Sequence, residues 1–300
     1  MGQPAFSIVV PTFSRPERLK TCIESMCGLD YDRSLFDLVI VDDGSPDFAA
    51  VEAAVRDYRG RLQLQLVGNA HGGPASARNA GARHARGEYV AFTDDDCRVD
   101  PGWLAAFARQ FAAAPRCIAG GRTVNALADN VYTAASESLV CYMRDYHLRK
   151  GAPFFATNNL ALHREVLAGI GGFDERFPLA AGEDREFCDR CVHSGHAFAY
   201  VADAVVLHYH ALSLRRFVRQ HYNYGRGAFF FRQLHADRER DGQIELEPWS
   251  FYTNLLTHPL SNRADKALRL SLLMVVSQFA NTTGFFVERA RRSRAPEARS

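Results

Sequence analysis

Short β-branched runs alternate with segments of helical spacing through the first 124 residues, and this alternation limits the folds open to the chain. The runs predict buried strands at 7–10, 37–41, 62–67, 89–93 and 118–124. The intervening segments predict helices at 18–26, 49–58, 74–85 and 103–113. Such alternation is typical of an α/β domain with a doubly wound, mostly parallel central sheet.

The later part of the chain is less regular. Residues 125–151 predict a partly helical insertion, followed by a strand at 154–162, a helix at 182–194 and a strand at 197–207. Beyond residue 212 the pattern becomes helical and aromatic. We therefore expect one α/β unit over 1–211, divided near residue 124, and a helical C-terminal extension over 212–300.

Composition excludes several classes of protein. Apolar residues make up 47% of the chain and charged residues 23%, as in ordinary globular proteins. A net charge of +2 gives no reason to expect nucleic acid as a partner. The seven cysteines form no disulfide framework, and the first apolar run stops at Pro11, which argues against a secretory signal. We expect a cytoplasmic protein with reduced thiols.

Three acidic residues follow the predicted strand at 89–93. Asp94, Asp95 and Asp96 would repel one another without a cation, and oxygen ligands at a strand end suit Mg²⁺ or Mn²⁺. The alternative is an acidic loop that caps the helix starting near Trp103. Because ligands of parallel sheets bind beyond the carboxyl ends of the strands, this position favours a site.

Two other strands end in polar turns, at Pro11–Ser14 and Asp42–Ser45. Gly72 and Gly73 then form a tight turn into a helix whose first turn could face phosphate. The Gly-Lys-Ser/Thr of a P-loop is absent, and no Gly-x-Gly-x-x-Gly follows the first strand. Kinase, P-loop and dinucleotide-binding functions are therefore disfavoured, whereas a nucleotide bound with a cation fits the pattern.

Three ordered blocks carry a family resemblance. They are SIVVPTFSRPERL with VIVDDGS, then GGPASARNAGARHARGEYVAFTDDDC, then GGFDERFPLAAGEDREFCDR. Together they resemble glycosyltransferase family two, of GT-A fold, from residue 6 to about 227. The resemblance implies that 1–211 is a catalytic domain, with a nucleotide-binding half at about 1–124 and an acceptor half at about 125–211. It also implies an inverting sugar transfer from a nucleotide donor, with Mn²⁺ or Mg²⁺.

The resemblance assigns roles to individual positions. It implies nucleotide contacts for the polar strand ends and one arginine: Pro11, Thr12, Phe13, Asp42, Asp43, Arg78, Asp94 and Asp95. Asp43 would accept a hydrogen bond from the base, whereas Asp42 assists or only holds the turn. Asp94 and Asp96 would be the two acids of the metal motif, with Asp96 binding the metal directly and Asp94 acting through the ribose or a water.

Asp184 is the expected general base, because an inverting displacement needs a carboxylate that takes the proton of the acceptor hydroxyl. The residues support this position, since Phe187, Cys188 and Cys191 place Asp184 on the inward face of its helix. The helix N-terminus favours the ionised carboxylate and burial disfavours it, so the sequence leaves its pKa open. The alternative role is a helix N-cap.

Four further residues are candidates for sugar or diphosphate contacts: Arg122, Asn158, Asn159 and Glu183. We expect the two asparagines to lie on a strand. His208 and His210 follow the last predicted strand, and in related enzymes a histidine here can complete the metal shell. His208 is the preferred ligand, which tilts the metal towards Mn²⁺; a structural histidine is the alternative.

The C-terminal extension departs from processive members of the family, which carry Gln-x-x-Arg-Trp near Gln220. Here the equivalent is Gln220-x-x-Asn223-Tyr224, and the segment 268–287 is too interrupted to predict a spanning helix. Both features favour the addition of a single sugar. Segment 268–294 predicts either packing against the domain or a second copy of the chain, or peripheral contact with an anionic inner membrane face.

Two other functions are the alternatives to a glycosyltransferase. A sugar nucleotidyltransferase would carry a glycine-rich basic loop after the first strand, and a non-catalytic nucleotide-sugar-binding module would be expected to lose Asp184 or the acidic triplet. Neither fits as well as a glycosyltransferase of glycoconjugate synthesis acting on a glycan or lipid-linked acceptor. Asp43 suits a UDP-sugar donor, with GDP or dTDP as alternatives.

Overall fold

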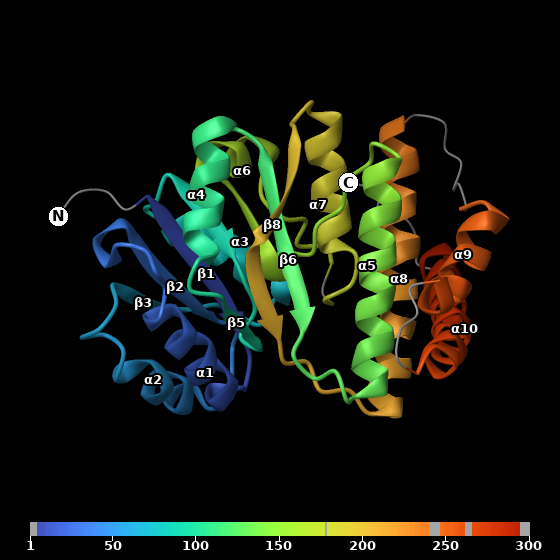
Figure 1. Ribbon diagram of the computed structural model, residues 1–300, viewed down its shortest axis with the longest axis horizontal. Coiled ribbons are helices and arrows are strands. Elements are labelled where there is room, and N and C mark those ends of the chain that lie inside the picture. Colours follow the sequence, from blue (N-terminus) through green and yellow to red (C-terminus); the bar gives the residue numbers. More distant parts are fainter. Residues whose placement is uncertain (1–4, 178, 240–246, 262–265, 295–300) are drawn as a thin grey trace.

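A computed structural model describes residues 5–177, 179–239, 247–261 and 266–294. Parts of the two expected units, at 1–4, 178, 240–246, 262–265 and 295–300, lie outside these described residues. Figure 1 shows the sheet with its helices, and the C-terminal helices beside it at one end of the molecule.

The strands are β1 (Phe6–Thr12), β2 (Phe36–Asp42), β3 (Leu64–Gly68), β4 (Tyr89–Phe92), β5 (Cys97–Val99), β6 (Ile118–Asn125), β7 (Leu160–His163) and β8 (Phe198–His208). The helices are α1 (Pro16–Cys27), α2 (Phe48–Arg56), α3 (Pro74–His84), α4 (Trp103–Ala113), α5 (Val131–Arg149), α6 (Arg164–Ile170), α7 (Glu183–His193), α8 (Leu214–Glu239), α9 (Trp249–Ser261) and α10 (Ala267–Arg294). The α/β class and the helical C-terminal extension are confirmed.

The strands form one sheet in the order β3-β2-β1-β4-β7-β6-β8-β5. The β1–β2, β2–β3, β1–β4 and β6–β8 pairs are parallel, as predicted. The β4–β7, β6–β7 and β5–β8 pairs are antiparallel. The sheet is therefore mixed, because β7 runs against both of its neighbours.

Helices cover both faces of the sheet, because strands such as β1 and β2 are apolar on both sides. Ile8 and Val10 of β1 pack in a core with residues of α1, α2 and α4. Val9, between them, faces a second core that includes residues of α3, α6 and α7. This doubly covered sheet holds the ends of its strands in fixed positions.

One local prediction was wrong, and two short elements were not predicted. The segment expected as one strand at 154–162 is a short 3₁₀ turn, Thr157–Asn159, followed by the four-residue strand β7. The Asn159 side chain explains the turn, because it accepts from Trp103 Nε1 at 2.8 Å and donates to the Ala204 carbonyl at 2.9 Å. The three-residue strand β5 and the short helix α6 were not predicted.

The extension packs against α5. Tyr142 on α5 donates a hydrogen bond of 2.8 Å to the Phe251 carbonyl on α9, and both rings share a core with Met274 of α10. Helices α8 and α10 lie against each other through Gly225 and Gly284, where added Cβ atoms would overlap backbone of the opposite helix. Small residues at a crossing allow such a close approach.

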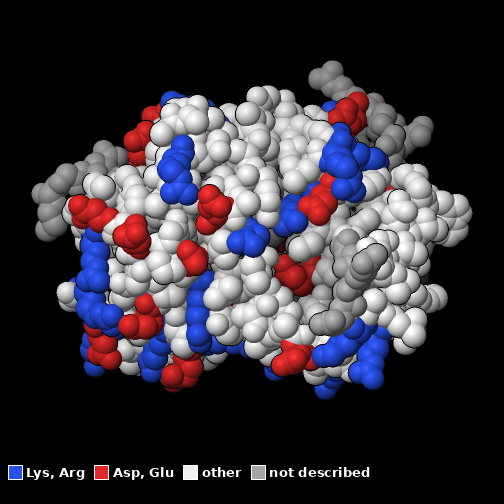
Figure 2. All heavy atoms as spheres, viewed as in Figure 1, with Lys and Arg blue, Asp and Glu red and all other residues white. Residues whose placement is uncertain are grey.

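The outer side of α10 is apolar and exposed. Leu268, Leu272 and Phe279 expose 78%, 65% and 72% of their surface. By length and composition, Ala267–Ser293 could cross a membrane, so the prediction that this segment falls short of a spanning helix is wrong on those criteria. On the face shown in Figure 2, acidic and basic side chains are interspersed and the region at the right-hand edge is largely uncharged.

Candidate active site

The ends of β1 and β2 lie side by side and are tied to the loop before α3. The amide of Asp43 donates to the Thr12 carbonyl at 2.9 Å. The Asp43 carboxylate accepts from the amides of Gly72 and Gly73 at 3.1 and 2.9 Å and from Asn69 Nδ2 at 2.9 Å. Asp43 therefore organises the glycine turn that leads into α3.

Asp42 and Phe13 have different surroundings. Asp42 is buried, and its carboxylate accepts from the amide and hydroxyl of Ser45, so it holds the turn. Phe13 is exposed and stacks on His71, with ring centroids 4.5 Å apart and planes 27° apart. The two rings form an aromatic ledge beside Asp43, which also accepts from His71 through its carbonyl at 2.9 Å.

The three carboxylates of the acidic triplet after β4 have different partners. Asp94 accepts from Arg78 Nη2 at 3.0 Å. Asp95 is buried and accepts from Thr12 Oγ1 at 2.7 Å and Arg15 Nη1 at 3.2 Å. Asp96 faces the end of β8. The three carboxylates are therefore kept apart by cations and donors placed between them.

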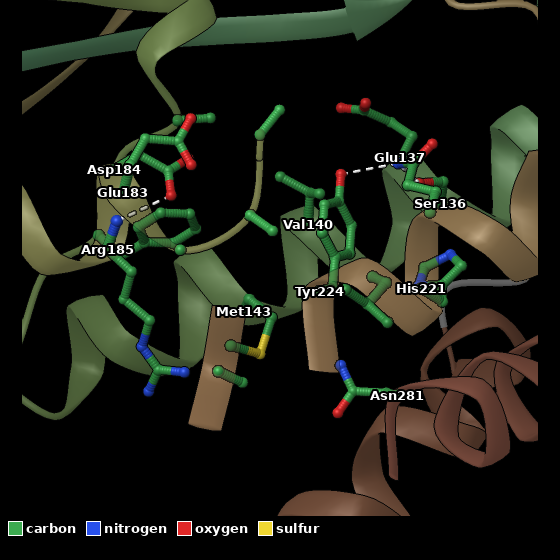
Figure 3. Close-up of a pocket in the computed structure, with 18 of the residues that line it drawn as sticks. Ser136, Glu137, Val140, Met143, Glu183, Asp184, Arg185, His221, Tyr224 and Asn281 are labelled. Atoms are coloured by element: carbon green, nitrogen blue, oxygen red, sulfur yellow. Dashed lines mark hydrogen bonds between the residues drawn. The ribbon is translucent and has the colours of Figure 1, made fainter. Parts of the chain in front are cut away.

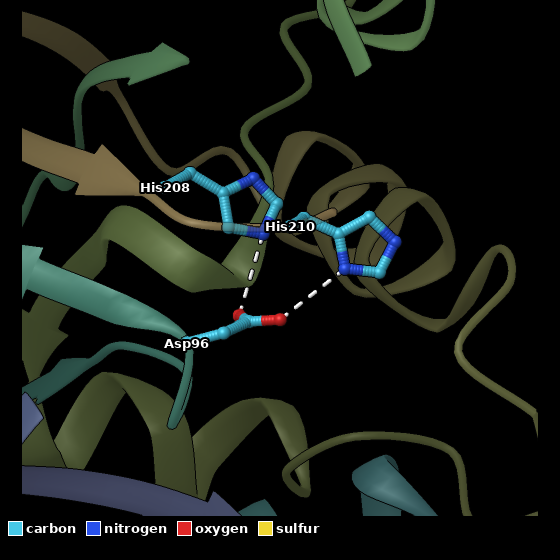
Figure 4. Close-up of side chains that lie close together, drawn as sticks. All are labelled: Asp96, His208 and His210. Atoms are coloured by element: carbon cyan, nitrogen blue, oxygen red, sulfur yellow. Dashed lines mark hydrogen bonds and ion pairs between the residues drawn. The ribbon is translucent and has the colours of Figure 1, made fainter. Parts of the chain in front are cut away.

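Asp96, His208 and His210 lie close together in a cluster and point towards one another (Figure 4). Their possible ligand atoms all lie within 4.8 Å of one another. Asp96 Oδ1 lies 3.3 Å from His208 Nε2, and Oδ2 lies 3.2 Å from His210 Nδ1. The β5–β8 pairing produces this arrangement, because Cys97 is directly opposite His208. Asp94, the other acid of the expected metal motif, accepts from Arg78 instead, and His210, the less preferred of the two histidines, takes part in the cluster.

Electrostatics separate the two inner acids. Burial alone would raise the pKa of Asp96, but hydrogen bonds from His208 and His210 lower it well below its usual range. Arg18 Nη1 adds a contact at 3.0 Å. Burial raises the pKa of Asp95 to about 6 against the opposing effects of Arg15 and Thr12. Of these two carboxylates, the one beside the two imidazoles is therefore the more strongly ionised.

The N-terminus of α7 carries the two acids expected there. Arg78 is buried and joins them to the triplet, because Nη1 donates to Glu183 Oε1 at 3.0 Å while Nη2 donates to Asp94. The Asp184 carboxylate accepts from the Arg185 amide at 2.8 Å. Burial, and then the negative charge of Glu183, raise the pKa of Asp184 to about 7. The sequence left open whether burial or the helix dipole decides the pKa of Asp184, and here burial and the charge of Glu183 outweigh the dipole.

A cavity of about 300 Å³ brings these groups together. Arg78, Asp94, Glu183, Asp184, His208 and His210 line it towards the sheet, and residues of α5, α8, α9 and α10 line it towards the extension. In the view of Figure 3, Asp184 and Glu137 lie on opposite sides of the cavity and the Tyr224 ring lies between them. The two acids at the start of α7 and the C-terminal helices thus line one chamber.

Two of the expected sugar or diphosphate contacts are not supported. Arg122 is exposed and donates to the Ala202 carbonyl at 3.2 Å, whereas its neighbour Thr123 lines the cavity. Asn159 exposes only 2% of its surface, and both polar atoms of its side chain are used in the core. Asn158 does line the cavity and accepts from Thr123 Oγ1 at 3.1 Å.

Several residues of the site were missed by the sequence analysis. Gln220 contacts His210 and two of these missed residues: its Oε1 is 3.0 Å from His210 Nε2, and its Nε2 donates to Tyr224 Oη at 2.7 Å and Ser136 Oγ at 3.1 Å. Glu137 of α5 lines the same cavity. The motif position of Gln220 was a usable signal, but a single acid on an irregular helical segment such as Glu137 gave none.

Known proteins resemble this chain in sequence over most of its length. Residues 7–171 match the model of glycosyl transferase family 2. A pre-mycofactocin glycosyltransferase of Mycobacterium tuberculosis is 26% identical over 242 residues, which cover 77% of this chain but only 48% of the relative. Glycosyltransferase AglE of Haloferax volcanii is 24% identical over 210 residues, covering 68% of this chain and 67% of the relative. The chain thus spans about half the length of the first of these.

Solved structures show the same fold. The mannosyltransferase PcManGT of Pyrobaculum calidifontis, solved with GDP-Man and Mn²⁺, superposes with a TM-score of 0.62 at 21% identity, covering 98% of this chain and 76% of that one. A TarS fragment of S. aureus, solved with UDP-GlcNAc, superposes with a TM-score of 0.55 at 17% identity, covering 96% and 91%. The chain belongs to glycosyltransferase family 2 and has the GT-A fold.

Proposed function

We propose that this glycosyltransferase moves a single sugar from a nucleotide-sugar donor to an acceptor hydroxyl, with inversion at the anomeric carbon and with a divalent metal. The observation that carries the proposal is the Arg78 bridge, which joins Asp94 of the acidic triplet to Glu183 beside Asp184 within one cavity. A diphosphate at the triplet and an acceptor at Asp184 would then lie on either side of the transferred sugar.

The chemistry follows from these positions. Asp184 takes the proton of the acceptor hydroxyl while that oxygen forms its bond to the anomeric carbon, and the bond to the nucleoside diphosphate breaks. Arg78 lies where it can offset negative charge on the leaving diphosphate. The pKa of Asp184, raised to about 7, suits a group that must accept a proton near neutral pH. Glu183 is held by Arg78 and keeps the start of α7 in place.

The donor atoms of the cluster fit a divalent cation. A carboxylate and two imidazoles suit Mn²⁺ better than Mg²⁺, and the cation would neutralise charge on the diphosphate. Asp96, His208 and His210 would hold it, with Asp94 acting through the ribose or a water. The neighbour solved with GDP-Man and Mn²⁺ supports a metal of this class.

The donor and acceptor follow from the surroundings. The Phe13–His71 ledge and Asp43 would receive the base, with Pro11 and Thr12 beneath it. Similar structures hold GDP-Man and UDP-GlcNAc, so we propose a UDP-sugar donor with GDP- and dTDP-sugars as the alternatives. The chamber extends to α9 and α10, which suits a glycan or lipid-linked acceptor.

A thermal-shift panel tests the donor and the metal. With Mn²⁺, one class among UDP-, GDP- and dTDP-sugars is expected to raise the melting temperature by several degrees, and EDTA should abolish the shift. Asp96→Asn should abolish it too, because the variant removes the charge that faces both imidazoles. Asp203→Asn, an exposed carboxylate on β8, is the matched control. If none of the nucleotide-sugars shifts the melting temperature of a folded protein, a non-catalytic module is favoured. Release of a sugar 1-phosphate product would favour a nucleotidyltransferase.

We also propose that the exposed face of α10 binds the inner surface of an anionic membrane. Its apolar side chains Leu268, Leu272 and Phe279 are uncovered, and Arg289, Arg291 and Arg292 follow them. Apolar and basic residues on one helix suit an interfacial position.

Sedimentation with vesicles tests this surface. The chain should pellet with vesicles containing anionic lipid and be released by high salt, and Leu272→Ser together with Phe279→Ser should reduce binding by about tenfold. Vesicles of neutral lipid are the control. A chain that stays in the supernatant and forms dimers through this face would instead show that α10 covers a second copy.

A further inference from the structure

Two helices present matched pairs of metal-ligating residues outside the active site. Asp189 and His193 are four residues apart on α7, and His235 and Glu239 are four residues apart on α8. Residues at this spacing lie on one face of a helix, and here the two faces meet. The donor atoms of His193, His235 and Glu239 lie within 4.8 Å of one another.

Hydrogen bonds fix which nitrogen of each imidazole is free. His193 Nδ1 lies 3.0 Å from the Asp189 carbonyl oxygen, which can only accept, so Nδ1 carries a proton. His235 Nδ1 lies 3.0 Å from an Asp189 carboxylate oxygen. Both rings therefore direct Nε2 away from Asp189. A histidine that binds a metal through one ring nitrogen usually donates a hydrogen bond from the other to a carboxylate or a carbonyl.

The contact between His193 and Glu239 calls for a positive charge. His193 Nε2 and Glu239 Oε1 are 2.5 Å apart, and a neutral ring protonated on Nδ1 would place a lone pair against the carboxylate. Either a proton or a metal ion must therefore lie there. Arg238 does not supply the charge, because its guanidinium is bonded to Asp189 and Glu186.

We propose that His193, His235 and Glu239 bind a zinc ion that fastens the C-terminal end of α7 to α8. Two imidazoles and one carboxylate, with a water as the fourth ligand, form a ligand set that zinc accepts in tetrahedral geometry. Ligand atoms around such an ion are about 3.3 Å apart, so small side-chain rotations would bring the three observed ligand atoms to that spacing. Asp189 orients both imidazoles through its contacts with their Nδ1 atoms.

The site differs in position from the proposed catalytic metal centre, although both offer two imidazoles and one carboxylate. His193 is the last residue of α7, whereas Glu183 and Asp184 begin that helix. The ion would hold the far end of the helix that carries the proposed base, and would therefore stabilise the catalytic helix without contacting substrate.

Zinc binding tests the proposal in a chain whose catalytic cluster has been removed by Asp96→Asn and His208→Ala. After dialysis against micromolar Zn²⁺, this chain should retain about one zinc per molecule by mass spectrometry, and Zn²⁺ should raise its melting temperature. Adding His193→Ala and His235→Ala should abolish both effects. His84→Ala is the matched control, because His84 is also an exposed histidine near a helix end whose Nδ1 lies 2.9 Å from the carbonyl four residues earlier.

Cobalt substitution supplies a second readout, since Co²⁺ at the site should give visible absorption bands of a four-coordinate ion that the His193→Ala/His235→Ala chain lacks. Retention of zinc unchanged by those substitutions would overturn the proposal. So would a folded chain that binds no zinc, which would leave a shared proton between His193 and Glu239.

Discussion

Replacing Asp184 with Asn is expected to lower kcat for sugar transfer by about 10³-fold, within the 10²–10⁴ contributed by a positioned general base. The amide keeps the shape of the side chain but cannot accept the proton of the acceptor hydroxyl. Donor affinity should change little, because the Arg78, Asp94 and Asp96 contacts remain. Release of the nucleoside diphosphate with an acceptor present measures kcat. Asp203→Asn is the control, because Asp203 is an exposed carboxylate. Asp189→Asn on the same helix is unsuitable, because Asp189 contacts His235 and Arg238.

The pH dependence of the wild-type enzyme should report the same group. Since the base must be unprotonated and its pKa is raised to about 7, kcat should rise with pH through about 7 and level off above about 8. The rising limb should disappear in Asp184→Asn. An unchanged profile and rate in that variant would remove Asp184 from the proton transfer.

Stability should move in the opposite direction to activity. Asp184 has a folded-state pKa above its unfolded value, so the folded state holds the proton more tightly and loses stability as pH rises from about 4 through about 7. The neutral Asn avoids the cost of a buried charge. Asp184→Asn should therefore melt at a higher temperature than wild type at pH 8, which would also show that lost activity does not reflect unfolding.

Gly225→Ala is expected to lower the free energy of unfolding by about 2–4 kcal/mol, a large effect for a single methyl group. The added Cβ would overlap the carbonyl of Asn281 on α10, and backbone on both sides of the contact cannot rotate away. Helices α8 and α10 would have to separate. Because Asn281 also lines the cavity, acceptor affinity should fall together with stability.

Chemical denaturation monitored by circular dichroism measures this loss. Gly169→Ala is the matched control, since Gly169 lies in helix α6, has no atoms near the position of an added Cβ and should tolerate alanine or gain stability. Equal stability of the two variants would show that the α8–α10 contact can relax at little cost.

The parallel part of the sheet was predictable because its strands are apolar on both faces and its helices begin at prolines such as Pro16 and Pro74. The helix Trp103–Ala113 agrees with the predicted range at both ends. Pairings between distant segments were not predictable in this way. Strand β5 has only three residues and exists because it pairs with β8, so no local pattern marks it.

The site shows the same division. Motif positions predicted that Asp184, Arg78 and the acidic triplet lie close together, and Arg78 does join Asp94 of the triplet to Glu183 beside Asp184 in one cavity. The sequence did not show which side chains of a strand face the cavity. Arg122 and Thr123 are neighbours, and the side that faces the cavity depends on the register of β6 against β8, including its irregularity between Gly121 and Arg122. Glu137 enters the cavity only because α5 lies across it.

The separation of Asp96 and His210 along the chain has a consequence for how this enzyme is made. These two residues are 114 positions apart and come together only through the pairing of β5 with β8. During synthesis, the ends of β1 and β2 emerge from the ribosome long before the imidazoles of His208 and His210 do. A growing chain can therefore order its first strands without being able to assemble the Asp96–His208–His210 cluster, so chemistry on costly activated sugars would wait until translation has passed residue 210.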